Sequence, residues 1–257
     1  MDHGRLAGRV ALVTGASRGI GAAVARAFAA EGASLALAHE PVAAMSGPAE
    51  DLAAQLRTAG TKAVALGADL ADPAAVDDLV SGTRAHLGPL DIVVANAALS
   101  ARTPWRDITV ADWDRVFAVN LRASWLLARA AYPDLVAGGR GSIITVSSVM
   151  ARTGQTGALH YTASKAGIIG LTRALAREAG PDGVRVNAVM PGAIRTEHEQ
   201  ELDPDADAVF AQITAVQALK RRGNADDLTG TFVYLASDES AFVTGQVLTV
   251  DGGWVFG

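Results

Sequence analysis

The chain has 257 residues, and its 22 Lys and Arg against 27 Asp and Glu give a formal net charge of −5 at pH 7. This balance provides no basic surface of the kind that binds nucleic acid, so we expect no nucleic-acid partner. The sequence contains no cysteine, which excludes disulfides, thiolate catalysis and cysteine-type metal sites. A reducing compartment is compatible with that absence.

The N-terminal segment MDHGRLAGRV lacks the apolar stretch of a secretory signal, and no run of about 18 apolar residues is available to cross a membrane. We therefore expect a cytoplasmic protein with no membrane partner. Half of the residues are hydrophobic, and no Pro/Gly/Ser-rich linker divides the chain. The prediction is one domain over residues 1–257 with one large core.

Seven short apolar runs predict buried strands, because each is rich in β-branched residues and leaves room for a helix before the next. They are Val10–Thr14, Ser34–Ala38, Ala63–Leu66, Asp91–Ala95, Ser142–Ser147, Val184–Met190 and Gln246–Val250. Continuous hydrophobicity indicates strands that are covered on both faces, as in a parallel sheet. The predicted fold class is α/β, a single-domain doubly wound parallel sheet of about seven strands with helices on both faces.

The segments between these runs have helical periodicity. After the first strand, Ile20, Val24 and Phe28 recur every four residues, and Gly32 ends this helix. Further helices are expected at Ala49–Ala59, Pro73–His86, Thr109–Leu135, Ala158–Ala179 and Asp226–Leu235.

One long polar interval, Arg195–Asp207, follows the sixth strand. It is either a solvated surface loop or part of a mobile flap over a pocket, and we expect such a substrate flap around residues 193–220. The cluster Glu197-His198-Glu199 lies within it and is expected to be solvated, so no metal site is predicted.

The first strand runs into its helix through Thr14-Gly15-Ala16-Ser17-Arg18-Gly19-Ile20-Gly21. Glycines let the chain turn sharply and let its backbone approach a phosphate, whose charge the helix N-terminus stabilises. Such a turn also occurs as a tight connection without a ligand. Its position between a strand and a helix favours phosphate binding.

A second pattern combines a serine, a tyrosine and a lysine. Tyr161 and Lys165 are four residues apart and share one helix face, so the ammonium is expected to lower the phenol pKa from about 10. Tyr161 is then a candidate general acid/base. Ser148, at the end of the fifth strand, can donate a hydrogen bond to a substrate carbonyl. A Tyr-x-x-x-Lys pair alone is common by chance and is then more often an amphipathic surface pair, but the serine, the glycine turn and Asn120 beside it favour the catalytic interpretation.

Together these motifs resemble those of the short-chain dehydrogenases/reductases, whose TGxxxGxG turn matches TGASRGIG. Further matches are Asp69, Asn96-Ala97-Ala98, Asn120, the run from Pro191 to Thr196, and Asp251-Gly252-Gly253. They extend from Gly8 to Gly253, nearly the whole chain. The family usually has glycine where Ala98 stands. The resemblance implies a Rossmann-type fold.

The resemblance also implies site residues. The catalytic set is Asn120, Ser148, Tyr161 and Lys165, with Asn120 completing a proton relay through water. The implied cofactor-binding set is Gly15, Ser17, Arg18, Gly19, Ile20, Gly21, His39, Asp69, Leu70, Asn96, Ala97, Tyr161, Lys165, Pro191, Gly192, Ile194 and Thr196. Asp69 would bind the adenine amine, and Lys165 the nicotinamide ribose.

The implied reaction is hydride transfer between NAD(P) and a small-molecule secondary alcohol or ketone. His39 stands where NAD-preferring relatives generally have Asp, and Arg18 can pair with a 2′-phosphate, whereas Glu40 opposes it. NADP(H) is therefore slightly favoured over NAD(H).

Other functions share part of this motif set. A 3-oxoacyl carrier-protein reductase has the same motifs, and a non-catalytic dinucleotide-binding regulator is disfavoured because Tyr161 and Lys165 are both present. A halohydrin dehalogenase is disfavoured by the phosphate-binding glycines, and an extended epimerase by its different turn. Small residues in the Tyr161 helix and the resemblance favour a homotetramer or dimer. The substrate itself is not readable from the sequence.

Overall fold

A computed structural model of the chain describes residues 4–197 and 206–256. Seven parallel strands form one sheet in the order β3-β2-β1-β4-β5-β6-β9. Their bounds are β1 (Val10–Thr14), β2 (Ser34–His39), β3 (Ala63–Gly67), β4 (Ile92–Ala95), β5 (Ser142–Val146), β6 (Arg185–Pro191) and β9 (Val247–Val250). The predicted fold class is confirmed, and every predicted strand is present to within one or two residues.

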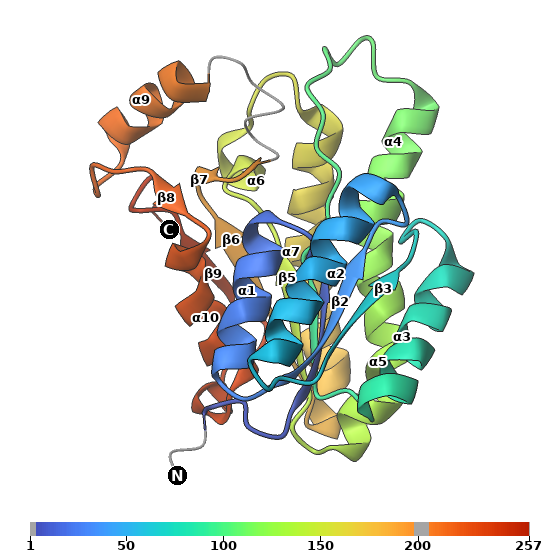
Figure 1. The fold of residues 1–257 in the computed structure, drawn as a ribbon. Coiled ribbons are helices and arrows are strands. Elements are labelled where there is room, and N and C mark those ends of the chain that lie inside the picture. Colours follow the sequence, from blue (N-terminus) through green and yellow to red (C-terminus); the bar gives the residue numbers. More distant parts are fainter. Residues whose placement is uncertain (1–3, 198–205, 257) are drawn as a thin grey trace.

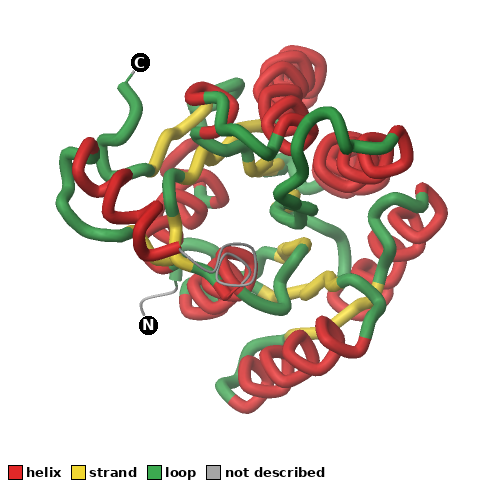
Figure 2. Tube along the Cα trace, turned by 90° about the horizontal axis from the view of Figure 1, so that it is seen from above, coloured by secondary structure: helices red, strands yellow, loops and turns green. Residues whose placement is uncertain are grey.

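Helices cover both faces of the sheet (Figures 1 and 2). One core packs helices α1 (Gly19–Ala30), α2 (Ala43–Thr58) and α10 (Asp226–Ala236) against one face. The other core packs α3 (Pro73–Leu87), α5 (Ala123–Ala137) and α7 (Leu159–Ala179) against the opposite face. Side chains alternate along each strand, so Leu12 belongs to the second core while its neighbours Ala11 and Val13 belong to the first. Such double burial explains the continuous hydrophobicity of the strands.

Two helices differ from the sequence expectation. Helix α2 begins at Ala43, before the expected Ala49, and contains Pro48. Proline removes one backbone hydrogen bond from a helix, and its ring clashes with the preceding turn. The sequence pattern therefore favoured a later start. The expected helix Thr109–Leu135 is divided into α4 (Val110–Phe117), a π-helical turn at Ala118–Arg122, and α5.

Regular structure flanks the polar interval Arg195–Asp207, and its middle lies outside the described residues. Strand β7 (Ile194–Arg195) pairs in parallel with β8 (Gly223–Asn224), and α9 (Ala206–Val216) lies between them in sequence. Residues 198–205, including His198 and Glu199, lie outside the described residues. The short elements are α6 (Met150–Thr153) and the 3-10 turns Gly180–Asp182 and Asp238–Ser240.

Strand order reverses at β1, which lies between β2 and β4. In such a sheet a crevice opens beyond the carboxyl ends of the strands at this reversal, and ligands bind there. Helices α4, α6 and α9 and strand β7 lie at that end, toward the top of Figure 1. The opposite end is closed by the buried Arg9, which bonds to the Ala236 carbonyl and to Asp238.

Helix α1 begins in close contact with the turn that precedes it. A Cβ at Gly21 would lie 2.1 Å from the Gly15 carbonyl oxygen and 2.8 Å from Asn96 Nδ2. Both distances are well inside van der Waals contact, and the first neighbour is backbone. Only glycine therefore allows the helix to start this near the end of β1.

We expect Gly21→Ala to lower the free energy of unfolding by about 1–3 kcal/mol or more, because the turn must move to admit the methyl group. Thermal unfolding measures this as a lower Tm, by roughly 2–4 °C per kcal/mol for a chain of this size. Gly230→Ala in α10 is the matched control. Its Cβ has no neighbour within 4 Å, so this variant should gain about 1 kcal/mol from helix propensity. Equal stability of Gly21→Ala and the unmodified chain would contradict the close contact.

Candidate functional site

A pocket of about 340 Å³ lies at the carboxyl ends of β1 to β4. It is lined by the glycine turn, the ends of β2, β3 and β4 and one side of α4. Its residues include these members of the predicted cofactor set: Gly15, Ser17, Arg18, Gly19, Ile20, His39, Asp69, Leu70, Asn96, Ala97 and Thr196. The remaining members, Gly21, Tyr161, Lys165, Pro191, Gly192 and Ile194, do not line it.

The glycine turn is held in shape by β4. Gly15 has φ +66° and Gly19 has φ +57°, which are left-handed conformations that favour glycine. The Asn96 side-chain amide donates to the carbonyl oxygens of Thr14 (2.9 Å) and Gly15 (3.4 Å). The Thr14 hydroxyl in turn accepts from the backbone N–H groups of Asn96 and Ala97. Asn96 thus acts mainly as a brace between β1 and β4.

The N-terminus of α1 faces a carboxylate from far along the chain. Glu197 Oε2 accepts from the Gly19 N–H at 3.1 Å, whereas the N-cap residue of α1 makes no side-chain capping bond. A negative charge at this position interacts favourably with the helix dipole. The contact shows that this N-terminus accepts an anionic oxygen, which is what phosphate binding requires.

At the other end of the pocket, Asp69 is paired with Arg115 of α4. Arg115 Nη1 lies 2.9 Å from Asp69 Oδ1 and 2.8 Å from Oδ2, and its Nη2 lies 3.8 Å from Glu40 Oε1. The guanidinium holds the pKa of Asp69 below its usual value. His39 is buried, and its Nδ1 donates to the Glu40 carbonyl at 2.8 Å, since a carbonyl can only accept.

Asn120 lies in the π-helical turn and is 2% exposed. Its Oδ1 accepts from the Leu99 N–H at 2.8 Å, while its Nδ2 donates to the Leu99 carbonyl and to Ser164 Oγ. Ser164 Oγ donates to the Tyr161 carbonyl at 2.7 Å. The Asn120 side chain therefore links the pocket edge at Leu99 to the helix that carries Tyr161. π-helical turns of this kind are frequent at functional sites.

Lys165 is 2% exposed, and its Nζ donates to the Val146 carbonyl at 2.8 Å. Burial lowers the pKa of this ammonium to about 8. The same Nζ lies 5.7 Å from the centre of the Tyr161 ring. Lysine and tyrosine thus share one face of α7, as the spacing predicts.

The electrostatics of Tyr161 differ from the sequence expectation. Burial raises the pKa of its phenol, and the opposing effects come from a hydrogen bond with Ser148 and the positive charge of Arg102, not from Lys165. The reason is geometric, because the Lys165 ammonium is directed at the Val146 carbonyl. The prediction that Lys165 lowers the Tyr161 pKa is therefore wrong for the chain without a bound ligand, where this pKa is raised.

Ser148 follows β5 and adjoins the loop after β6. The Val149 N–H donates to the Pro191 carbonyl at 3.0 Å, and a Cβ at Gly192 would meet the Asp251 Cα at 2.6 Å. This packing fixes the ends of β5, β6 and β9 against one another. Ile194 of β7 lines a second, smaller pocket instead of the first.

Arg115 and Glu197 line the pocket although neither was predicted from the sequence. For Arg115 the one sequence signal is its i,i+4 spacing from Val119, the residue immediately before Asn120. No local signal exists for Glu197, because its partner Gly19 is 178 residues away. Among residues 4–197 and 206–256, no group of three potential ligands could hold a metal ion, and no helix there has the length and apolarity needed to cross a membrane.

Comparison with known proteins agrees with this geometry. A family model described as enoyl-(acyl carrier protein) reductase matches residues 15–255. The chain is 38% identical over 249 residues to an L-rhamnose 1-dehydrogenase (NAD(P)(+)) of Sphingomonas sp. (strain SKA58), covering 96% of each. It is 35% identical over 247 residues to the 3-oxoacyl-[acyl-carrier-protein] reductase of Escherichia coli (strain K12), covering 96% of this chain and 97% of that enzyme.

A solved structure is similar to almost the whole molecule. It is a short-chain dehydrogenase from Burkholderia cenocepacia J2315 in complex with NADP, with a TM-score of 0.89 and 37% identity. The match covers 97% of this chain and 99% of that one. Sequence, fold and pocket thus lead to one conclusion: the chain belongs to the short-chain dehydrogenase/reductase family.

Proposed function

We propose that this chain transfers hydride between NADP(H) and a secondary alcohol or ketone, with Tyr161 as the acid/base. The observation that carries the proposal is the proximity of Ser148 and Lys165 to Tyr161 in the chain that also bears the glycine-turn pocket. Its family membership makes the chain an oxidoreductase of CH–OH and C=O groups.

The pocket fits a nicotinamide dinucleotide. A Cβ at Gly15 would lie 3.0 Å from the Ala97 Cα, so glycine lets the turn pack closely against the end of β4. The N–H groups at the start of α1 supply donors for a diphosphate, as the Gly19 bond to a carboxylate illustrates. When bound, the nicotinamide supplies the hydride chemistry. The predicted cofactor-binding residues would hold and orient it.

The protein's own groups handle the proton. Tyr161 would donate a proton to the carbonyl oxygen in reduction and accept it in oxidation. Ser148, which lies beside Tyr161, would turn its single hydroxyl hydrogen to the same substrate oxygen and stabilise its developing charge. Asn120 would position α7 through Ser164 and take part in the water relay. Lys165 would hold the ribose.

NADP(H) is the proposed cofactor in preference to NAD(H). His39 stands at the end of β2, where an acid would repel a 2′-phosphate, and Arg18 lines the same pocket. A related short-chain dehydrogenase was solved with NADP.

A 3-oxoacyl carrier-protein reductase is the second candidate, because the chain is 35% identical to such an enzyme. For either function we propose that the chain is one domain in which residues 193–220 act as the substrate flap. A homotetramer or dimer and a cytoplasmic location remain predictions from the sequence.

Replacing Tyr161 by Phe tests the mechanism. Tyr161→Phe should lose turnover by about 10²–10⁴-fold, because the ring remains while the proton donor is removed. Ser148→Ala should lose about 10²–10³-fold, as expected for a lost oxyanion donor. Turnover is followed as NADPH absorbance with a ketone panel, and NADPH affinity by fluorescence titration. Tyr132→Phe is the control, because the Tyr132 hydroxyl donates its hydrogen bond to the exposed Asp182 and does not line the pocket. Near-normal turnover in Tyr161→Phe would refute the mechanism.

The raised pKa of Tyr161 predicts its behaviour in the chain without cofactor. Burial favours the neutral phenol, so Tyr161 should keep its proton at pH 10, where an ordinary tyrosine is half ionised. The tyrosinate absorbance of the unmodified chain minus that of Tyr161→Phe should have its midpoint above pH 10, with circular dichroism confirming that both remain folded. A midpoint below pH 10 would mean that cations and hydrogen bonds outweigh burial.

Glu197 predicts a competition at the phosphate site. Its carboxylate occupies the Gly19 N–H that a cofactor phosphate needs, so Glu197→Gln should bind NADPH roughly two- to fivefold more tightly. Fluorescence titration measures the Kd. Glu178→Gln makes the same charge change on α7, outside the pocket lining, and serves as the control. Equal tightening in both variants, or none in Glu197→Gln, would contradict the competition.

A further inference from the structure

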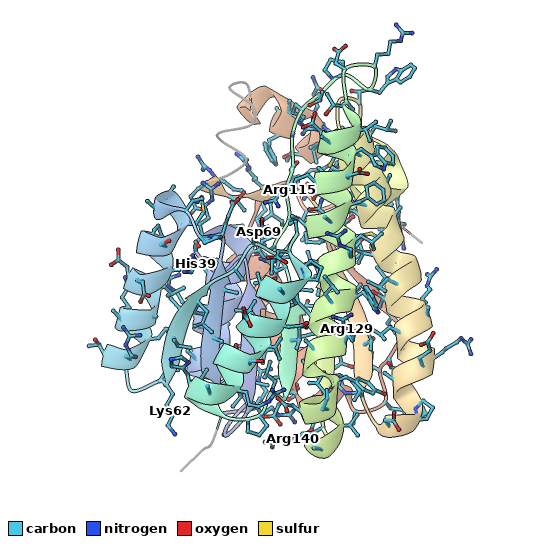
Figure 3. All side chains as sticks on the ribbon, turned by 90° about the vertical axis from the view of Figure 1, so that its right-hand side faces the viewer. His39, Lys62, Asp69, Arg115, Arg129 and Arg140 are labelled. Carbon is cyan, nitrogen blue, oxygen red and sulfur yellow. The ribbon has the colours of Figure 1, made fainter. Side chains whose placement is uncertain are left out.

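Three charged side chains meet at the end of the pocket where β2 and β3 finish. Glu40 follows β2, Asp69 follows β3, and Arg115 reaches both from α4. Figure 3 shows Arg115, Asp69 and His39 together at this end of the sheet. In a doubly wound fold the end of β2 is where the adenosine ribose of a dinucleotide lies. These charges therefore border the place where NADP differs from NAD.

The two carboxylates by themselves would oppose a phosphate. Glu40 and Asp69 each contribute a negative charge, and the 2′-phosphate of NADP would add roughly −1.5 to −2 more. Like charges in one partly enclosed site disfavour each other. Some positive charge must offset the carboxylates if the pocket is to accept NADP.

Arg115 has the geometry for that task. Its Nη1 is held by both oxygens of Asp69, at 2.9 and 2.8 Å, which fixes the guanidinium in the pocket wall. Its Nη2 is directed to the Glu40 side, 3.8 Å from the carboxylate, too far for a strong hydrogen bond. The Arg115 and Asp69 side chains are 40% and 41% exposed, so a ligand can reach them. A guanidinium that is strongly hydrogen-bonded through Nη1 and only loosely paired through Nη2 can bind a further anion through Nη2.

We propose that Arg115 determines the preference for NADP(H) over NAD(H), by offsetting part of the negative charge of Glu40 and Asp69 at the ribose end of the pocket and by offering Nη2 to the 2′-phosphate. This rests on the proposed function only in assuming that the pocket binds a nicotinamide dinucleotide. In the sequence, His39 favours NADP and Glu40 opposes it. The proposal reconciles the two, because the charge of Glu40 is offset by Arg115 from another element.

The test is the ratio of two affinities, measured by calorimetry or nucleotide fluorescence and so independent of turnover. Arg115→Met should weaken NADPH binding about tenfold or more and change NADH binding less than threefold, because only the phosphate requires the charge. Arg115→Lys, which keeps the charge, should retain the preference. Adding Glu40→Gln to Arg115→Met should restore much of the NADPH affinity, because one of the repelling charges is removed.

Arg129→Met is the matched control. Arg129 also pairs with an aspartate, Asp77, at 3.5 Å and similar exposure, but it lies lower on α5, away from the pocket (Figure 3). It should change neither affinity. Equal losses of NADH and NADPH in Arg115→Met would assign Arg115 a merely structural role and overturn the proposal. If the unmodified chain bound neither nucleotide, the proposed function would fail instead.

Discussion

The site depends on how closely helix α1 approaches the end of β1. Gly21 admits the Gly15 carbonyl where any Cβ would collide, and Asn96 holds the same carbonyl from β4. This contact places the N-terminus of the helix at the reversal of strand order, where the crevice opens. The place of the helix N-terminus in the pocket, and the contact of Glu197 with the Gly19 N–H, follow from it.

Much of the fold was predictable because its determinants are local. Each strand is covered on both faces, so its hydrophobicity is continuous and its limits are visible in the sequence. The early start of α2 was not visible, because Pro48 disfavours a helix locally while Leu52 and Leu56 anchor it in the first core. The pair β7–β8 was also hidden, since two-residue strands have no periodicity and their partners are 29 residues apart.

The site was predictable wherever a motif is contiguous. The glycine turn and the Tyr161–Lys165 pair were found because each lies within one turn or helix. Arg115 and Glu197 were not, because each acts on a residue from a distant element, 46 and 178 positions away. The direction of the Tyr161 pKa was wrong for a related reason: spacing brings Lys165 to the right face but does not reveal that its ammonium is bonded to Val146.

The π-helical turn at Ala118–Arg122 has a consequence for the whole α4–α5 rod. Each residue of an α-helix advances the side-chain direction by about 100°, so one extra residue in a wider turn rotates everything beyond it by that amount. Arg115 before the turn and Val119 within it face the pocket, whereas Ala123, Leu126 and Leu127 after it face the sheet core. A single continuous segment thereby serves both the ligand crevice and the hydrophobic interior. Insertions and deletions are consequently poorly tolerated here. A change of one residue would rotate either α4 away from the pocket or α5 away from the sheet core.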